Sequence, residues 1–131
     1  MHYTKEEAFN LHVKAVRYGL SGRELLRDTE AVMRQCNGIG AEWMPDSLTV
    51  LCTKLSPVRA VPAAIHDRRY HLKDIDRLAA DTEFLSNVMR MIELTYAWYD
   101  PRRYTMRKRA ARYYTYLRAF GGRAWEEAGE K

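Results

Sequence analysis

Three side chains in the middle of the sequence carry the chemistry of a general base and its supporting groups: His66, Asp67 and Asp81. A buried carboxylate can orient a histidine to accept a proton from water, because it holds the imidazole tautomer and stabilises the imidazolium. Asp67 follows His66 directly, so on a helix it points about 100° away and is free to ligate a hard cation. The glycine-rich loop Asn37-Gly38-Ile39-Gly40 can turn its carbonyl oxygens toward such a cation.

His66 and Asp81 also have an ordinary structural interpretation. Asp81 falls within the apolar stripe of its predicted helix, but it could equally lie at the edge of that stripe, solvated or paired with Arg77. A single histidine on an apolar helix, such as His66, is most often a satisfied core residue. At the level of the sequence both interpretations stay open.

Apolar spacing and helix-capping signals predict an all-α fold, a small helical domain with two antiparallel core helices at about 61–71 and 74–99. Other helices are expected at about 4–18, 22–35 and 103–120. A glycine-rich loop that could bind a hard cation is expected before the core helices. The apolar stripe of the helix at 74–99 consists of Ile75, Leu78, Leu85, Val88, Met89 and Ile92.

Residue types at the helix ends set the predicted boundaries. These signals are the capping-box pairs Thr4/Glu7 and Ser21/Glu24, Pro62 as a helix start, and Gly121-Gly122 as a helix stop. Between the second and third predicted helices, the segment 48–52 is either a short strand or an irregular buried segment.

The chain has 131 residues, of which 47% are hydrophobic and 30% charged, as in a soluble globular protein. We therefore expect a single domain over residues 1–131. No apolar run approaches the roughly 20 residues of a membrane helix, and the N-terminal residues do not have the pattern of a signal peptide. We expect synthesis in the cytoplasm without a signal peptide. Two cysteines cannot build a disulfide framework or a cysteine-only zinc site.

Four segments, at residues 36–46, 66–70, 80–85 and 113–125, together resemble the secreted phospholipase A2 superfamily. Residues 66–70, His-Asp-Arg-Arg-Tyr, fit its His-Asp-x-x-Tyr motif, and residues 80–85 resemble the Ala-Asp-x-x-Phe-Leu stretch of its viral and phage-type members. Residues 36–46 resemble the calcium loop of the phage-type versions, and the tail at 113–125 is also similar to theirs. The resemblance covers about residues 36–125, which we take as the core, with residues 1–35 as an N-terminal helical extension.

The resemblance implies a role for each matching residue. His66 would activate the water that attacks the sn-2 ester of a glycerophospholipid, Asp81 would orient His66, and Tyr70 would brace Asp81. Asp67 and backbone carbonyls near Asn37, Gly38 and Gly40 would bind Ca²⁺, which stabilises the oxyanion and holds the phosphate.

The sequence departs from the superfamily in its cysteines. Members usually carry a cysteine shortly before the histidine, bonded to one near the calcium loop, whereas Pro62 and Ala63 stand at those positions here. Cys36 and Cys52 are therefore either bonded to each other or both reduced.

Positive charge is concentrated toward the C-terminus. Residues 101–125 hold eight of the 22 basic residues and no acidic ones, with tyrosines interleaved. This composition suits an anionic membrane surface, nucleic-acid phosphates, or simply a solvated helix face whose tyrosines pack inward. The residues expected to contact membrane or phosphate are Arg103, Arg107, Lys108, Arg109 and Arg112.

We therefore predict a calcium-dependent phospholipase A2-like hydrolase of lipid degradation that acts at a membrane surface. The resemblance implies a phage-encoded protein, associated with the virion or released on lysis. One alternative is a non-catalytic virion or structural protein on the same scaffold. Another, less favoured, is a small basic helical nucleic-acid-binding protein with a helix-turn-helix around Gly19–Ser21, whose second helix is acidic at Glu24, Asp28 and Glu30.

Overall fold

The computed structural model describes residues 3–36 and 46–128, and every regular element in these two ranges is a helix. This confirms the predicted all-α fold. The elements are α1 (Lys5–Arg17), the 3-10 helix η1 (Arg23–Leu26), α2 (Thr29–Gln35), α3 (Asp46–Lys54), α4 (Ser56–Leu72), α5 (Arg77–Thr95) and α6 (Pro101–Ala128). The predicted calcium-type loop lies outside the described residues.

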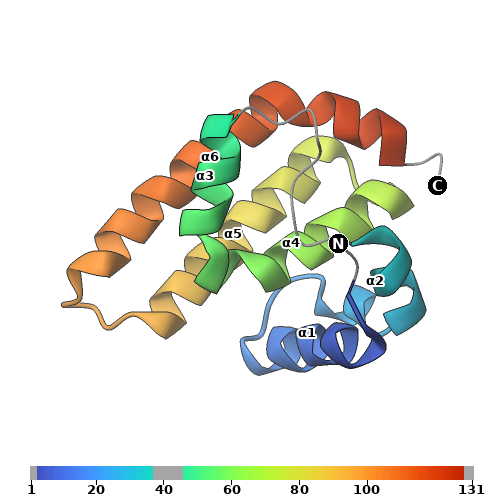
Figure 1. The fold of residues 1–131 in the computed structure, drawn as a ribbon, viewed down its shortest axis with the longest axis horizontal. Coiled ribbons are helices and arrows are strands. Elements are labelled where there is room, and N and C mark those ends of the chain that lie inside the picture. The colour runs from blue at the N-terminus through green and yellow to red at the C-terminus, as the bar shows by residue number, and fades with distance from the viewer. Residues whose placement is uncertain (1–2, 37–45, 129–131) are drawn as a thin grey trace.

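Helices α4 and α5 lie side by side in the middle of the molecule (Figure 1). The N-terminal elements α1, η1 and α2 pack against α4, α6 packs along α5, and α3 contacts both α4 and α6. A continuous hydrophobic core joins these elements, and its fully buried members include Leu20, Val32, Leu55, Ile65 and Ile92. The first 35 residues therefore share one core with α4 and α5. Within the described ranges, no helix combines the length and apolar character needed to span a membrane.

The start of α1 follows the sequence signals. The side chain of Thr4 accepts a hydrogen bond from the backbone of Glu7, and the Glu7 side chain accepts one from the backbone of Thr4. These reciprocal bonds satisfy two N–H groups that have no partner within the helix. The predicted capping box at Thr4 and Glu7 is confirmed.

The prediction of one helix over 22–35 is wrong, because this segment forms two elements, η1 and α2. Gly22 adopts a left-handed φ of +83°, and a Cβ built there would lie 2.7 Å from Cγ2 of Ile65. Asp28 then caps a new helix by accepting a hydrogen bond from the backbone of Ala31. The Ser21 hydroxyl, expected to cap a helix, instead donates to Glu83 of α5.

Residues 48–52 belong to α3, so the expectation of a strand or irregular segment there is wrong. A short apolar run has too few residues for periodicity to separate a strand from a buried helix. Helix α4 also begins earlier than the predicted start at 61, with Pro57 in its first turn and Pro62 in its interior. Pro62 is itself fully buried among neighbours that are also buried, which offsets the lost backbone hydrogen bond.

Helix α5 begins after Asp76, whose side chain accepts a hydrogen bond from the backbone of Ala79. It ends at Thr95, short of the predicted 99. Its buried face differs from the predicted stripe, because Leu78 is exposed. The buried residues of α5 are Ala80, Asp81, Phe84, Asn87, Val88, Met91 and Ile92.

Helix α6 begins at Pro101, close to the predicted start, but it does not stop at Gly121-Gly122 and continues to Ala128. In a helix the carbonyls of Leu117 and Arg118 point toward positions 121 and 122. The Arg77 guanidinium packs against this part of α6, and its Nη2 donates to both carbonyls at 2.9 Å and 2.8 Å. A Cβ at Gly121 would lie 3.2 Å from the same nitrogen. Gly121 therefore serves helix packing, and neither glycine ends the helix.

Candidate functional site

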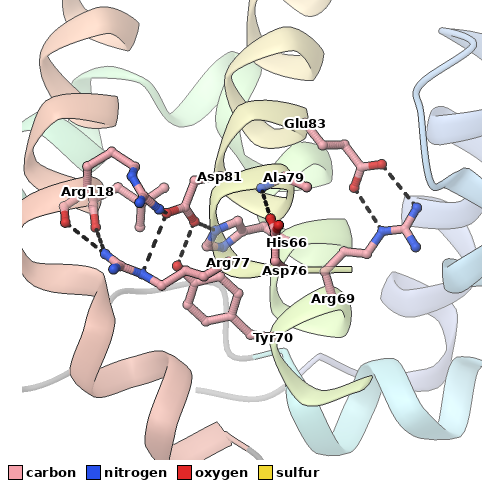
Figure 2. Close-up of polar contacts among 10 residues, drawn as sticks. His66, Arg69, Tyr70, Asp76, Arg77, Ala79, Asp81, Glu83 and Arg118 are labelled. Atoms are coloured by element: carbon pink, nitrogen blue, oxygen red, sulfur yellow. Dashed lines mark hydrogen bonds and ion pairs between the residues drawn. The ribbon is translucent and has the colours of Figure 1, made fainter. Parts of the chain in front are cut away.

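His66 on α4 and Asp81 on α5 face one another across the contact between the two helices (Figure 2). Nε2 of His66 lies 2.7 Å from Oδ1 of Asp81. Asp81 is completely buried, and His66 is 8% exposed. The structure thus brings together the two residues expected to form the general-base pair, and Asp81 does not lie solvated at the edge of its stripe.

Tyr70 stands one turn after His66 on α4 and reaches the same carboxylate oxygen. Its hydroxyl donates to Oδ1 of Asp81 at 2.6 Å, and its ring lies 4.2 Å from the His66 imidazole between centroids. Burial and the hydrogen bond to Asp81 raise the pKa of Tyr70, so the hydroxyl remains protonated. Trp125 of α6 packs edge-on against Tyr70 at 5.0 Å. Tyr70 is therefore held in place from both sides.

Two arginines approach the second oxygen of Asp81. Nη1 of Arg118, on α6, donates to Oδ2 at 2.6 Å, and Nε of Arg77 lies 3.7 Å from the same atom (Figure 2). The sequence suggests the contact between Arg77 and Asp81, because Arg77 stands one turn before Asp81 on the same helix. In the sequence, Arg118 is only one of many basic residues. Only the packing of α6 against α5 brings Arg118 to this site.

The surroundings of Asp81 keep it ionised. Burial alone would raise the pKa of Asp81, but the hydrogen bonds from His66, Tyr70 and Arg118 outweigh it and hold the pKa below its usual value. An ionised carboxylate only accepts hydrogen bonds, so Nε2 of His66 carries the proton. In the neutral imidazole the lone pair is then on Nδ1, which is the atom available to accept a proton.

Asp67 lies half-buried next to His66, and no side chain within the described ranges donates a hydrogen bond to it. Burial raises the pKa of Asp67 to about 6, and the electrostatic effects of His66 and Arg59 offset only part of this rise. A partly buried carboxylate with few positive neighbours is a favourable ligand for a hard cation. The donor type therefore fits Ca²⁺.

The predicted calcium ligands Asn37, Gly38 and Gly40 lie outside the described residues. Cys36, directly before them, is buried against α4, where its thiol donates to the carbonyl of Ala64 at 3.4 Å. Burial and, after it, the charge of Asp67 raise the pKa of this thiol. Ala64 stands about one turn before Asp67 on α4. The last described residue before the candidate loop thus contacts α4 about one turn before the candidate carboxylate ligand. Within the described ranges, no group of three or more His, Cys, Asp or Glu side chains could hold a metal by itself.

The two cysteines are free thiols, and both are buried. Of the two possibilities left open by the sequence, the structure shows the reduced pair. Cys36 nevertheless contacts α4 just before His66, the region where members of the resembled superfamily carry a disulfide.

The basic residues predicted to contact membrane or phosphate occupy the first half of α6 but differ in exposure. Arg107, Lys108 and Arg112 are exposed, whereas Arg103 and Arg109 are half-buried. Arg107 also pairs with Glu93 of α5 at 3.2 Å. Their charges are therefore not all equally available to an external partner.

Comparisons with protein-family models, with curated proteins and with solved structures find no match to this chain. The functional interpretation consequently depends on the residues themselves and their geometry.

Proposed function

We propose that this protein is a calcium-dependent, phospholipase A2-like hydrolase that cleaves the sn-2 ester of glycerophospholipids. The observation that carries the proposal is the 2.7 Å contact between Nε2 of His66 and a buried, ionised Asp81 that Tyr70 also contacts. This arrangement matches the roles that the resemblance implies for the three residues. The proposal also takes α4 and α5 as the antiparallel pair of core helices of that superfamily.

The reaction uses His66 first as a base and then as an acid. Nδ1 accepts a proton from a water molecule as the water oxygen attacks the sn-2 carbonyl carbon. Asp81 stabilises the imidazolium that results. The tetrahedral intermediate then expels the glycerol oxygen, which takes the proton from Nδ1, so that a fatty acid and a lysophospholipid are released.

In this proposal, Asp67 and backbone carbonyls near Asn37, Gly38 and Gly40 hold the calcium ion. The raised pKa of Asp67, and the contact of Cys36 with Ala64 about one turn before Asp67, support this assignment. When bound, Ca²⁺ supplies Lewis-acid stabilisation of the oxyanion and binds the substrate phosphate.

The proposed partner is a phospholipid bilayer, approached by the basic residues of α6. Exposed lysine and arginine near an anionic surface each contribute about 1 kcal/mol of attraction. The biological setting that accompanies this proposal is a phage protein carried in the virion or released on lysis. Detection of the protein in purified particles by mass spectrometry would support the virion setting, and its absence from them would oppose it.

The decisive experiment measures fatty-acid release from mixed phospholipid vesicles with calcium and with a chelator. We expect calcium-dependent release by the wild type and a loss of at least about 100-fold in His66→Gln. His12→Gln on α1 is the matched control and should retain full activity. No release by the wild type, or unchanged release by His66→Gln, would overturn the catalytic proposal.

A second candidate is a non-catalytic virion or structural protein on the same scaffold. The observation that favours it is the ion pair between Arg118 and Asp81, because a carboxylate that links α5 to α6 has a structural role without any catalysis. Calorimetric titration with Ca²⁺ separates the two candidates. Absence of binding at millimolar calcium, together with an inactive wild type, would favour the non-catalytic protein.

A further inference from the structure

Three aromatic side chains are exposed around the turn between α5 and α6. Trp98 is 83% exposed, Tyr99 is 74% exposed, and Tyr104 in the first turn of α6 is 64% exposed. We call these three residues the aromatic tip. The turn that carries Trp98 and Tyr99 lies at one end of the long axis of the molecule, away from α1 and α2 (Figure 1). Large apolar groups left in water at such a position indicate a contact site.

The backbone of this turn is held in place by local hydrogen bonds. The backbone N–H of Asp100 donates to the carbonyl of Ala97 at 2.9 Å. The Asp100 side chain then accepts a hydrogen bond from the backbone of Arg102, and Pro101 begins the helix between them. The rings of Trp98 and Tyr99 meet edge to face at 5.6 Å. The aromatic tip is thus a formed structure whose exposure follows from the turn.

Positive charge continues from the tip along one face of α6. Tyr104, Lys108 and Arg112 are all exposed and recur at a spacing that places them on the same face of the helix. Nζ of Lys108 lies 4.9 Å from the centre of the Tyr104 ring. The acidic residue at the turn, Asp100, is already paired with Arg102 at 2.7 Å. The surface beside the tip therefore favours an anionic partner.

We propose that the aromatic tip and the adjacent basic face dock the protein on an anionic phospholipid bilayer. Tryptophan and tyrosine favour the headgroup layer of a bilayer. Their apolar rings face the hydrocarbon region there, while the polar N–H or O–H group stays in contact with water and headgroups. Lys108 and Arg112 are then positioned to contact lipid phosphates. Aromatic residues that stack on single-stranded nucleic acid instead line a basic groove that follows the strand, whereas these lie on a projecting turn.

This docking site is separate from the candidate catalytic residues. Along α5, the distance from Asp81 to the end of the helix at Thr95 is about 20 Å at the rise of an α-helix. The inference depends on the proposed function only in taking phospholipid as the partner. Binding at the tip and hydrolysis at His66 can consequently be tested one without the other.

Vesicle flotation in the presence of a chelator tests the inference, with the His66→Gln chain so that no lipid is consumed. The vesicles contain either phosphatidylcholine alone or phosphatidylcholine mixed with phosphatidylglycerol. We expect binding to the anionic vesicles that weakens with added salt. The double change Trp98→Ala/Tyr99→Ala should reduce the affinity at least about tenfold, since both rings leave the interface. The change Lys108→Gln/Arg112→Gln should have an effect of similar size.

Matched controls come from α1, which also exposes apolar and basic residues. The changes Phe9→Ala/Val16→Ala and Lys14→Gln/Arg17→Gln remove exposed apolar and basic side chains from α1, away from the turn between α5 and α6 (Figure 1), and should leave vesicle binding unchanged. Thermal unfolding followed by circular dichroism checks that each variant is folded. Trp98→Phe should also abolish most of the lipid-induced blue shift in tryptophan emission.

Several results would overturn the inference. The first is that the His66→Gln chain does not float with the anionic vesicles. The second is that Trp98→Ala/Tyr99→Ala leaves flotation unchanged, and the third is that the α1 control variants lose as much vesicle binding as the variants at the tip. A gel shift of single-stranded DNA without vesicle binding would overturn it in favour of a nucleic-acid surface. If vesicle binding follows the prediction while the wild type releases no fatty acid, the proposed function fails and the docking site stands.

Discussion

Asp81 is the residue on which the polar contacts of the site converge. His66 and Tyr70 contact Oδ1, Arg118 contacts Oδ2, and the carboxylate is completely buried. A buried charge is tolerated only when its hydrogen-bonding capacity is filled. Asp81 therefore has a structural role in joining α4, α5 and α6, in addition to any role in orienting His66.

The contribution of Tyr70 to stability can be measured directly. Tyr70→Phe removes a hydrogen bond to an ionised, buried carboxylate, so we expect the free energy of unfolding to fall by about 1.5–3 kcal/mol. Urea denaturation is the measurement. Tyr104→Phe, which removes a hydroxyl from an exposed ring, should change stability by less than about 0.5 kcal/mol. Equal effects of the two changes would contradict this account of the site.

Asp67 should make stability depend on pH in the absence of calcium. Its pKa is about 6 in the folded chain, above the ordinary value of 3.8, so the folded state keeps this proton to higher pH than the unfolded state. The contribution of Asp67 to the free energy of unfolding is therefore fully present below about pH 4. It is lost as the pH rises from about 4 to about 6. The loss amounts to at most about 3 kcal/mol.

The comparison of wild type with Asp67→Asn isolates this effect from other titrating groups. Urea denaturation at several pH values between 4 and 7, with a chelator present, gives the difference between the two proteins. We expect Asp67→Asn to gain stability relative to the wild type as the pH rises. A difference that stays constant across this range would show that burial does not raise the pKa of Asp67.

At the scale of the elements, two glycines allow close packing for different reasons. Gly22 combines a left-handed backbone with contact against Ile65 of α4, while Gly121 leaves space for Arg77 on α5. Side chains also tie the elements together. Asn87 exchanges two hydrogen bonds with the backbone of Ser21, and Arg69 binds both oxygens of Glu83 (Figure 2). The N-terminal segment is thus fastened to the helices that carry the site.

Gly22→Ala and Gly122→Ala should have opposite effects on stability. At Gly22 a Cβ would meet Ile65 at 2.7 Å in a left-handed conformation, so we expect a loss of about 1–3 kcal/mol or more. At Gly122, which lies within α6, the nearest side-chain atom would be 3.7 Å away, and alanine should stabilise the helix by about 0.5–1 kcal/mol. Thermal and urea unfolding measure both. A tolerated Gly22→Ala would contradict the close approach of η1 to α4.

At the scale of the whole molecule, the candidate calcium site would join the N-terminal segment to α4. Cys36 ends the described N-terminal part in contact with Ala64, about one turn before Asp67 on α4, and the predicted carbonyl ligands follow Cys36 in the chain. An ion bound by both parts stabilises only the folded chain, because the unfolded chain does not hold them together.

Calcium should therefore raise the stability of the entire protein. At a calcium concentration one hundred times the dissociation constant, we expect a gain of about 2.7 kcal/mol in the free energy of unfolding at neutral pH. Differential scanning calorimetry with calcium or a chelator measures it. Asp67→Asn should abolish most of the gain, whereas Glu6→Gln on α1 should retain it. An unchanged transition of the wild type at millimolar calcium would argue against the ion.

The sequence by itself determined the helical class, the capping box at Thr4 and the presence of a histidine with two nearby aspartates. These features are local, since apolar spacing and capping depend on residues within one or two turns. The same local signals misplaced the glycine and proline boundaries. Pro62 and Gly121 lie inside helices, because packing against neighbouring helices outweighs their intrinsic preference.

Only the tertiary structure decided which groups complete the site. Arg118 is far from Asp81 in the chain, and nothing in its local pattern distinguishes it from the other arginines of α6. The buried face of α5 likewise depends on what α4 and α6 present to it, which is why Leu78 is exposed while Asp81 is buried. A carboxylate whose burial is favourable only with partners from three helices cannot be recognised from one helix alone.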